Sequence, residues 1–346
     1  MKHQTTRYGE IPFYKIGTFG NTADAFISKK LFLEYKTKYS FPKKGDILIS
    51  ASGTIGRAVI YDGKPAYFQD SNIVWIDNDE TLVKNDFLFY AYSNVKWNTE
   101  HTTILRLYND NFRNTLIPLP PLNEQIAIAN ILSDLDRYLC ALDSLILKKE
   151  GVKKSLSFEL LSQRKRLKGF NQAWQKVRLG DIANYLTSNL SVEQITQQGK
   201  IKVYDVNNFI GYTDTTFISD KPYISIVKDG SVGRVRILPP KTNILSTMGA
   251  LIANHRTTTE FLFYLLSNFD FKNFTSGSII PHIYFKDYKE KTIFLPPLNE
   301  QIAIANILSA LDNEITSLKN KKRQFENIKK ALNHDLMSAK IRVLKK

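Results

Sequence analysis

The residue types that most often carry catalysis are scattered through this chain and form no familiar constellation. Its five histidines, His3, His101, His255, His282 and His334, stand alone and lack the spacing of a metal site. The sequence has no GxGxxG or GxxxxGK[ST] loop, no serine nucleophile elbow, and no Asn-Pro-Pro-Tyr tetrad to grip an extruded adenine. The acid-x-lysine tripeptide at 287–289 lacks the Pro-Asp dipeptide of the common nuclease pattern. The sequence therefore predicts a binding protein, with no catalytic residue, metal or cofactor of its own.

The strongest pattern in the chain is an exact internal repeat. Residues 119–133 (LPPLNEQIAIANILS) recur unchanged at 295–309, an offset of 176 positions. An identical block of this length indicates duplication, and its period is far too long for a solenoid of short repeats. The sequence therefore predicts two copies of one unit, related by an approximate two-fold symmetry within a single polypeptide.

A heptad pattern follows each copy of the repeat. Apolar residues step alternately by four and three, which is typical of a long helix packed against another helix. The Pro-Pro pairs mark the helix starts, and Asn123 and Asn299 are the predicted N-caps. We expect one helix from Glu124 to about 165 and a second from Glu300 to about 343, each about 60 Å long. Pairing within the chain is the favoured arrangement, with a helical hairpin or a homodimeric coiled coil as alternatives.

Two features are expected to perturb this helical seam. Gly151 lies inside the first helix, where glycine costs about 1 kcal/mol and favours a kink. Four lysines fall on the seam and should loosen it locally: Lys149, Lys153, Lys322 and Lys329.

The regions that precede each helix are different in character. They are rich in Tyr, Phe, Ile, Val and Thr and are punctuated by turn residues, which predicts short strands at 46–50, 58–61, 73–76, 223–227 and 235–238. Two short amphipathic helices are predicted at 87–95 and 260–268. The fold class is therefore α+β: globular domains at 1–118 and 170–294, and helical regions at 119–169 and 295–346. Two equal antiparallel helices would separate the globular domains.

The composition of the chain limits the kinds of partner that it is expected to bind. The chain has 346 residues, with 48 Lys and Arg against 33 Asp and Glu, for a net charge of +15. Such an excess, spread along the chain, favours a protein that lies along a polyanion such as double-stranded DNA. Cys140 is the single cysteine, so no disulfide framework is possible, which suits a reducing cytoplasm. No apolar run is long enough to predict a membrane partner, and a cytoplasmic location is expected.

At this point the residues resemble a known family. The pattern Pro-Pro-Leu-x-Glu-Gln-x-x-Ile-Ala-x-x-Leu, at 120–132 and again at 296–308, resembles the conserved regions of the specificity subunit of type I restriction-modification systems. The segments 45–56 and 174–183 are also typical of that family, and the resemblance covers essentially the whole chain.

The resemblance implies a function for each part. Two target-recognition domains would each read one half of a split, asymmetric DNA site, and the long helices would bind two modification subunits. S-adenosylmethionine would be held by those partners, which methylate adenine. A restriction subunit, with ATP and Mg, would complete an endonuclease. The specificity subunit has no activity of its own.

One departure from the family pattern concerns the first half. The second half opens with Trp174–Ala183 and then 200–204, whereas the first half begins almost directly at 11–15, which resembles the later segment. The first recognition domain is therefore expected to be N-terminally short. Its missing element would be either dispensable or supplied by another segment.

Candidate DNA contacts lie shortly before each Pro-Pro pair and beside two equivalent glycine loops, at 52–57 and 229–234. The glycines themselves (Gly53, Gly56, Gly230 and Gly233) are expected to form turns. For every contact the alternative is a solvated surface residue. The predicted base readers are Thr102, Thr103, Arg106 and Tyr108 in the first domain and Ser278, His282 and Tyr284 in the second. The predicted phosphate contacts are Arg57, Lys228, Arg234 and Arg236.

The polar residues of the exact repeat are candidates for partner docking, because two copies of one surface could bind two identical subunits. Recent gene duplication or recombination would also explain their identity. The predicted docking residues are Asn123, Gln125, Asn130, Asn299, Gln301 and Asn306. Two rival functions remain: a coiled-coil scaffold without a DNA role, and the recognition subunit of a system whose nuclease is fused to the methylase.

Overall fold

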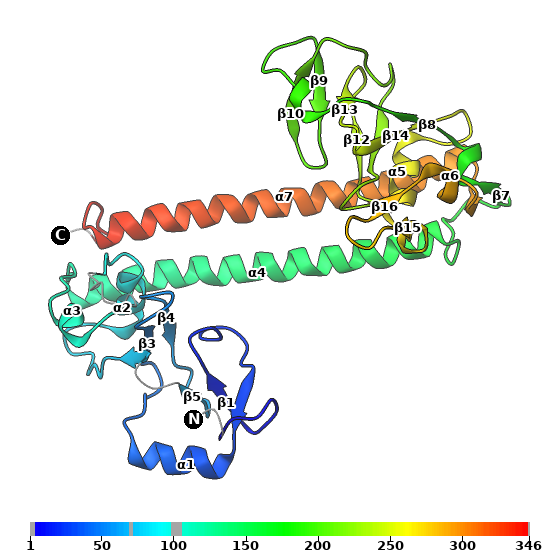
Figure 1. Cartoon of the computed structure of the whole chain (residues 1–346). Coiled ribbons are helices and arrows are strands. Elements are labelled where there is room, and N and C mark those ends of the chain that lie inside the picture. The colour runs from blue at the N-terminus through cyan, green and yellow to red at the C-terminus, as the bar shows by residue number, and fades with distance from the viewer. Residues whose placement is uncertain (1–3, 69–71, 98–105, 345–346) are drawn as a thin grey trace. The chain divides into compact units, whose positions relative to one another are not determined.

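The computed structural model describes residues 4–68, 72–97 and 106–344 (Figure 1). It divides into two compact units, which we call the first unit (residues 1–143 with 320–346) and the second unit (residues 144–319). Each unit therefore contains one globular region together with about half of each long helix. No helix in the described ranges is long and apolar enough to cross a membrane.

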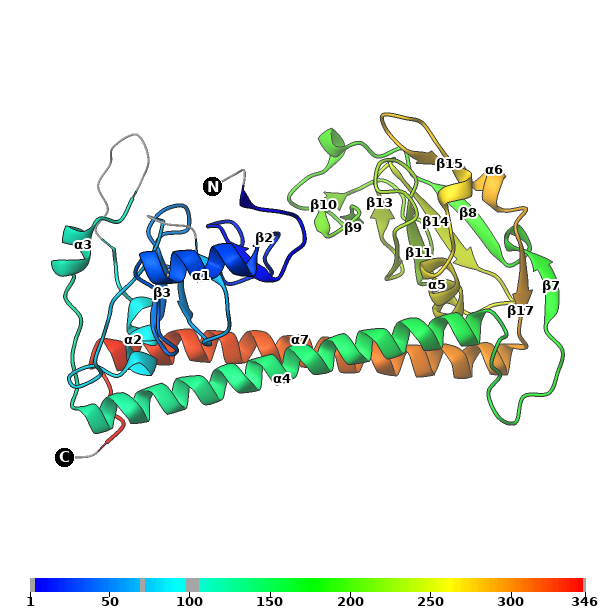
Figure 2. The same cartoon turned by 90° about the horizontal axis from the view of Figure 1, so that it is seen from below.

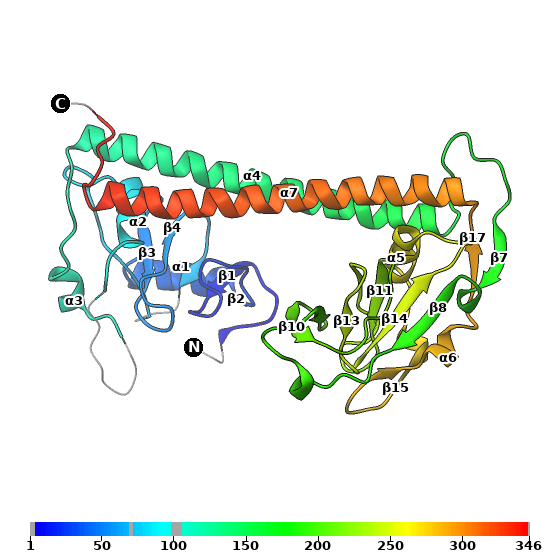
Figure 3. The same cartoon turned by 90° about the horizontal axis from the view of Figure 1, so that it is seen from above.

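The two long helices are α4 (Leu122–Leu161) and α7 (Leu298–Met337), of 40 residues each, and they run without a break in Figures 2 and 3. Each begins one residue before the predicted N-cap. Asn123 and Asn299 consequently lie in the first turn, where each side chain accepts from the next backbone N–H at 2.9 Å. The N-cap prediction was therefore wrong by two residues, since Pro121 and Pro297 directly precede the helices.

The helices also end earlier than the heptad pattern predicted. Gln163 and Ala339 have φ angles of 63° and 55°, the left-handed conformation that commonly ends a helix. These two residues are 176 positions apart, so the helix ends obey the same internal symmetry as the helix starts. Apolar spacing continues beyond both positions, but it no longer corresponds to helix.

Within each unit the two helices pack antiparallel, as predicted. In the first unit Ile128 and Leu132 of α4 share a core with Leu336 and Met337 of α7. In the second unit Leu160 of α4 lies in the same cluster as Ile304 and Leu308 of α7. In each unit, therefore, the copy of the repeat on one long helix packs against the end of the other long helix, and pairing within the chain is confirmed.

The seam lysines do not loosen it as expected, because every one of them forms an ion pair with the other helix. Their side chains are about two-thirds buried, with amine groups at the edge of the seam. Gly151 leaves α4 uninterrupted, and no atom lies within 4 Å of where its Cβ would be. The pairs are Lys149–Glu314 at 2.8 Å, Lys322–Asp143 at 2.6 Å, Lys153–Asp312 and Lys329–Asp136.

The globular part of the first unit contains two small sheets. One has the strand order β2-β1-β5 and the other β4-β3-β6, with α2 against the second. The elements are β1 (Ile11–Tyr14), β2 (Ala25–Ile27), α1 (Lys29–Lys38), β3 (Ile47–Ser50), β4 (Ala58–Ile60), β5 (Tyr67–Phe68), β6 (Ile73–Trp75), α2 (Asn85–Tyr92) and α3 (Asn109–Arg113).

The second unit repeats this plan and extends it. Its sheets have the orders β10-β9-β13 and β12-β11-β14-β8, with the pairs β17-β7 and β15-β16. The elements are β7 (Gln175–Arg178), β8 (Ala183–Thr187), β9 (Ile201–Tyr204), β10 (Phe209–Thr213), β11 (Tyr223–Val227), β12 (Val235–Leu238), β13 (Asn243–Ile244), β14 (Met248–Ala253), α5 (Thr259–Ser267), β15 (Thr275–Ser276), β16 (His282–Ile283), α6 (Phe285–Tyr288) and β17 (Thr292–Leu295), with single 3₁₀ turns at Leu179–Asp181, Val192–Gln194 and Lys272–Phe274.

The two globular regions match strand by strand. β1 pairs antiparallel with β2 and parallel with β5, and β9 pairs in the same way with β10 and β13. The order β4-β3-β6 matches β12-β11-β14. All five predicted strands and both predicted short helices are confirmed, with boundary shifts of a few residues at most. Over the described ranges of the first unit, no strand corresponds to β7, β8 or β17.

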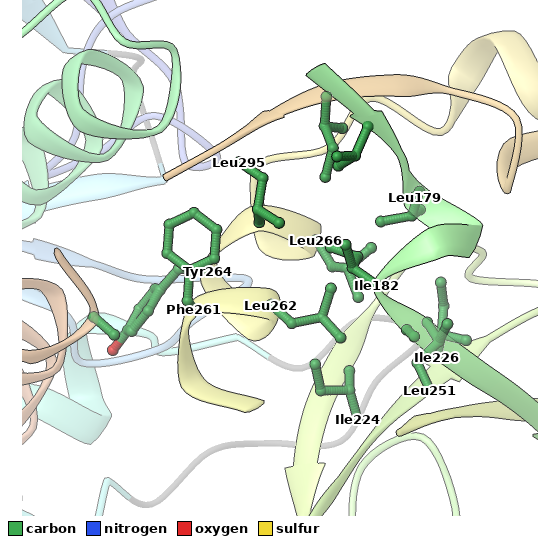
Figure 4. Close-up of a cluster of buried hydrophobic side chains, with 14 of the residues drawn as sticks. Leu179, Ile182, Ile224, Ile226, Leu251, Phe261, Leu262, Tyr264, Leu266 and Leu295 are labelled. Atoms are coloured by element: carbon green, nitrogen blue, oxygen red, sulfur yellow. The ribbon is translucent and has the colours of Figure 1, made fainter. Parts of the chain in front are cut away.

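The main core of the second unit gathers around α5 (Figure 4). Phe261, Leu262 and Leu266 on this helix contact Ile224 and Ile226 of β11 and Leu251 of β14 in one buried cluster. Leu179 and Ile182, from the connection between β7 and β8, complete the cluster.

Candidate nucleic-acid interface

A buried glutamine fixes each globular region on its helix. Gln125 donates to the backbone oxygens of Leu82 and Pro120 and accepts from the N–H of Lys84, at 2.8–2.9 Å. Gln301 makes the equivalent set with Arg256, Pro296 and Thr258, at 2.8–3.2 Å. An amide side chain can satisfy donors and acceptors together, which explains why this residue is repeated unchanged.

The neighbouring carboxylate ties the helix start to the end of the other helix. Glu124 binds Arg342 through two guanidinium nitrogens, the shortest contact being 2.5 Å. This pairing holds the pKa of the Glu124 carboxyl below its usual value, because the guanidinium stabilises the charged form. Glu300 binds Arg166 in the same way at 2.6 Å and also accepts from the indole N–H of Trp174 at 2.9 Å.

A tyrosine, an aspartate and a lysine form a third repeated connection. The Tyr90 hydroxyl donates to Asp136 at 2.8 Å, and Lys329 binds the same carboxylate. The Tyr264 hydroxyl donates to Asp312 at 2.9 Å, with Lys153 in the corresponding place. Burial, together with the adjacent carboxylate, raises the pKa of both phenols. Sequence reasoning missed these connections, although the tetrapeptide FLFY that ends in each tyrosine recurs at 87–90 and 261–264.

The glycine loops form tight turns, as predicted. Gly53, Gly56, Gly230 and Gly233 all have φ angles between 67° and 83°. A Cβ on Gly56 would meet Trp97 at 2.2 Å, and one on Gly233 would meet Phe271 at 2.6 Å. These glycines are therefore needed for backbone conformation and close packing.

Each glycine loop is bridged to a segment that carries predicted base readers. Ser52 forms a β-bridge with Arg106, and Asp229 forms one with His282. The adjacent backbone bonds are equivalent too, from Leu107 to Ala51 at 2.8 Å and from Ile283 to Lys228 at 2.9 Å. The structure thus brings Arg106 and His282 to the same place on the two scaffolds, 176 positions apart in sequence.

The side chains at these equivalent places differ in chemistry. His282 Nδ1 lies 2.7 Å from the Asp229 carboxylate, which orients the imidazole. Arg106 lies over the ring of Tyr108, with 5.9 Å between the guanidinium carbon and the ring centroid. Tyr284 is half-exposed and has the Lys286 amine 5.5 Å from its ring centroid. An arginine and a histidine–aspartate pair offer different hydrogen-bond patterns to a groove.

The predicted phosphate contacts lie beside the loops, but two of them also support a turn. Arg234 donates to the Asn207 side chain at 2.9 Å, and Arg236 donates to the Asn207 backbone oxygen at 2.9 Å. Arg57, the counterpart of Arg234, donates to the Asn21 side chain at 3.4 Å. Lys228 is half-buried in the bridged loop. Sequence reasoning missed both asparagines, because they are not at the offset of the repeat.

Thr102 and Thr103 lie outside the described residues. Ser278 is exposed in the turn between β15 and β16. The roles of all the base readers and phosphate contacts stay predictions, since the structure contains no DNA.

The docking residues separate into two groups. Gln125 and Gln301 are almost completely buried and serve within their own units, so the docking role predicted for them was wrong. Asn123 and Asn299 are bonded to the helix backbone but remain exposed. Asn130 and Asn306 are exposed on the helices, and docking stays a prediction for these four.

Comparison with known proteins decides the family. The model of the type I restriction modification DNA specificity domain matches residues 1–149 and again 171–327. The chain belongs to this family. Its two matched segments correspond to the two halves of the internal duplication.

Relatives agree with this assignment. The chain is 65% identical over 133 residues to a putative type I restriction enzyme specificity subunit, S.HindORF215P, of Haemophilus influenzae, a match covering 38% of this chain and 34% of that one. It is 28% identical over 337 residues to the putative MjaX specificity subunit of Methanocaldococcus jannaschii, covering 86% and 79% of the two chains. The MjaVIII specificity subunit of the same organism is 25% identical over 362 residues, covering 92% and 84%.

The fold is also known from solved structures. The type I restriction-modification S subunit of M. genitalium superimposes with a TM-score of 0.64 at 21% identity, over 97% of this chain and 91% of that one. A chain from a study of complex assembly in a type I system gives a TM-score of 0.53 at 16% identity, over 85% and 82%. At these identities the likeness establishes the fold.

Proposed function

We propose that this chain is the non-catalytic specificity subunit of a type I restriction-modification complex, which reads a two-part, asymmetric site on double-stranded DNA. The observation that carries the proposal is the pair of equivalent bridged segments. Arg106 and His282 occupy the same place on matched scaffolds, yet they present different chemistry. Two different candidate base-reading side chains on two matched scaffolds fit a DNA site with two different halves.

The remaining features support the same proposal. A net charge of +15 favours association with the DNA backbone. The repeated, exposed asparagines on α4 and α7 fit two copies of one partner, which we propose to be methyltransferase (modification) subunits. S-adenosylmethionine would be bound by those subunits, and ATP and Mg by a restriction subunit if one joins the complex.

The decisive experiment is to co-express the chain with its cognate modification subunit and to map adenine methylation in host DNA by single-molecule sequencing. We expect one split motif with two unlike half-sites and a methylated adenine in each, on opposite strands. A stable complex that leaves DNA unmethylated would contradict the reading of both half-sites. A chain that forms no complex would contradict the subunit assignment. Co-purification of a modification subunit fused to a nuclease would favour the related system instead.

Single substitutions then test which residue reads which half. His282→Ala should relax one half-site and leave the other unchanged, since a good base contact contributes about 1–3 kcal/mol of discrimination. The matched control is His255→Ala, an exposed histidine of the same unit outside the bridged loops. Loss of both half-sites together in His282→Ala, or an unchanged motif, would contradict the assignment of this segment.

A further inference from the structure

Asp229 and His282 stand directly opposite each other on two adjoining backbone segments of the second unit. The backbone hydrogen bonds at their bridge join the residues on either side of them, at 2.9 Å each. Asp229 and His282 therefore form a non-hydrogen-bonded antiparallel pair. The side chains of such a pair stand on one face and lie closer together than those of a hydrogen-bonded pair. The backbone thus brings the carboxylate to the imidazole.

Neighbouring residues also fix the position of the imidazole. His282 pairs with Ser276 in the β15–β16 ribbon, so its backbone is held on both sides. The ring of Tyr284 lies at 21° to the imidazole, with 6.5 Å between the ring centroids. A Cβ on Gly277 would lie 3.0 Å from His282 Cδ2 and would crowd this edge of the ring. The His282 side chain nevertheless remains 35% exposed, so it can contact a ligand outside the protein.

The carboxylate decides which nitrogen of the imidazole carries the proton. An ionised aspartate only accepts hydrogen bonds, so the 2.7 Å contact requires a proton on His282 Nδ1. Imidazole is ordinarily neutral above about pH 7 and then carries a single ring proton. Nε2 is consequently an acceptor. Within the part of the chain that the structure describes, Nε2 has no hydrogen-bond partner.

We propose that Asp229 is a positioning residue that determines base specificity. By holding the proton of His282 on Nδ1, it makes Nε2 the acceptor for an exocyclic amino group in the major groove of DNA. In that groove adenine N6 and cytosine N4 are the amino donors, whereas guanine and thymine present acceptors. The second unit therefore selects adenine or cytosine at the position that His282 contacts. This inference rests on the proposed function, because it names the class of base that the recognition segment reads.

The equivalent pair in the first unit has the opposite hydrogen-bonding character. Ser52 stands opposite Arg106 there, and the Ser52 hydroxyl donates to the Asn72 side chain at 3.1 Å. A guanidinium has donors only, so a base that Arg106 contacts must supply an acceptor. The carboxylate of Asp229 is thus the feature that gives the second unit an acceptor at the matching place.

The first test measures the imidazole in the free, full-length chain. The histidines are labelled with ¹⁵N, and two-bond ¹H–¹⁵N correlation spectra are recorded at about pH 8, where imidazole is ordinarily neutral. The spectrum of His282→Ala assigns the signals of His282. We expect a protonated Nδ1 and an unprotonated Nε2. A proton on Nε2, or on both nitrogens, would overturn the proposal.

Asp229→Asn should reverse this tautomer, because an asparagine amide can donate to Nδ1. The same exchange in a Ser-His-Asp triad leaves the geometry intact and produces the wrong tautomer. Nε2 then carries the proton and becomes a donor. An unchanged spectrum in Asp229→Asn would show that the carboxylate does not set the tautomer, and the proposal would fail.

The second test measures base preference in the purified complex of the full chain with its cognate modification subunit. The complex methylates a randomised DNA library at the same pH, and single-molecule sequencing gives the motif. We expect adenine or cytosine at the position where His282→Ala loses discrimination. Asp229→Asn should shift the preference there toward guanine or thymine by about tenfold or more and leave the other half-site unchanged. An unchanged preference at this position would overturn the proposal.

Two further variants separate the tautomer from a purely structural role of Asp229. Asp229→Ser places in the bridge the residue that Ser52 provides in the first unit, and a hydroxyl can donate or accept. The preference for amino bases should therefore fall by about tenfold, and an undiminished preference would count against the proposal. The matched control is Asp214→Asn, which alters an exposed carboxylate of the same unit that accepts from the Lys200 N–H at 3.0 Å. It should leave the motif unchanged, and a shift as large as that of Asp229→Asn would overturn the assignment.

The motif of the unmodified complex separates failure of the inference from failure of the proposed function. A motif without two unlike halves would overturn the proposed function and the inference together. A two-part motif with guanine or thymine at the position that His282 contacts would overturn the inference alone.

Discussion

The two units use the same connections to the helices but build different cores on them. In the second unit one large cluster extends from Leu308 on α7 through α5 to Leu179 and Leu251, and two smaller clusters lie elsewhere in the globular region. In the first unit the buried residues fall into several smaller clusters around Leu132, Leu48 and other centres. The repeated sequence therefore keeps the same connections between globular region and long helices in both units. A large continuous core is found only in the unit that has a β7–β8 segment.

The largest effect is expected from the repeated leucines. Leu308→Ala and Leu132→Ala each create a cavity at a completely buried site and should cost about 2–5 kcal/mol. We expect the second unit to lose more, because its cluster is continuous and cannot collapse around the cavity. Hydrogen exchange along a urea series reports the stability of the two units separately. A larger loss of unfolding free energy in the first unit would contradict this difference between the two cores.

The next effect comes from the buried glutamines. Gln125→Ala and Gln301→Ala each leave three backbone groups without their partner and should destabilise by about 1–3 kcal/mol. The backbone bonds are equivalent, so the two losses should be similar, with a somewhat larger loss at Gln301, which also accepts from the Thr257 hydroxyl at 2.9 Å. Exchange rates at 82–84 and at 256–258 would measure them separately. Strongly unequal losses would show that attachment is not conserved between the units.

A pH dependence of stability is expected from the pairing of Glu124 with Arg342 in the first unit. The Arg342 guanidinium lowers the folded-state pKa of Glu124, so this pairing stabilises the first unit above the carboxyl's unfolded pKa. That stability is lost as the pH falls through the lowered folded value. Glu124→Gln should therefore flatten the acid limb of stability for the first unit. Thermal unfolding between about pH 2 and 7 would show an unchanged acid limb if the pairing were unimportant.

The smallest effect is expected at the seam. Lys153→Met and Lys329→Met each remove one ion pair that is about one-third exposed, and each should cost at most about 1 kcal/mol. The loss should shrink as salt is raised. Thermal unfolding at low and high ionic strength would detect it. A large, salt-independent cost would mean that the lysines act through the tyrosine connections instead.

Much of this protein could be predicted from its sequence, because the signals were local or repeated. The exact block revealed the duplication, the four-three steps revealed the helices, and short strand-like runs between turn residues revealed strands such as β11 and β12. Predicted readers such as Arg106 and His282 were chosen because their segments lie shortly before each Pro-Pro pair, and the structure places these two residues in equivalent β-bridges. Their contact with bases stays a prediction.

Other features were decided only in three dimensions. Gln125 and Gln301 are polar residues of a kind expected on an exposed docking surface. Both are nevertheless buried, and each donates to a backbone oxygen more than forty positions away in the sequence. The seam lysines are charged residues at positions where the heptad pattern expects apolar side chains. Only the structure shows that carboxylates of the other helix lie beside them. Asn21 and Asn207 have no repeat offset to reveal them. Sequence determined which residues recur and with what period, because those are properties of order along the chain. Tertiary structure decided which polar groups find partners and which edges stay open, because those depend on neighbours that are remote in sequence.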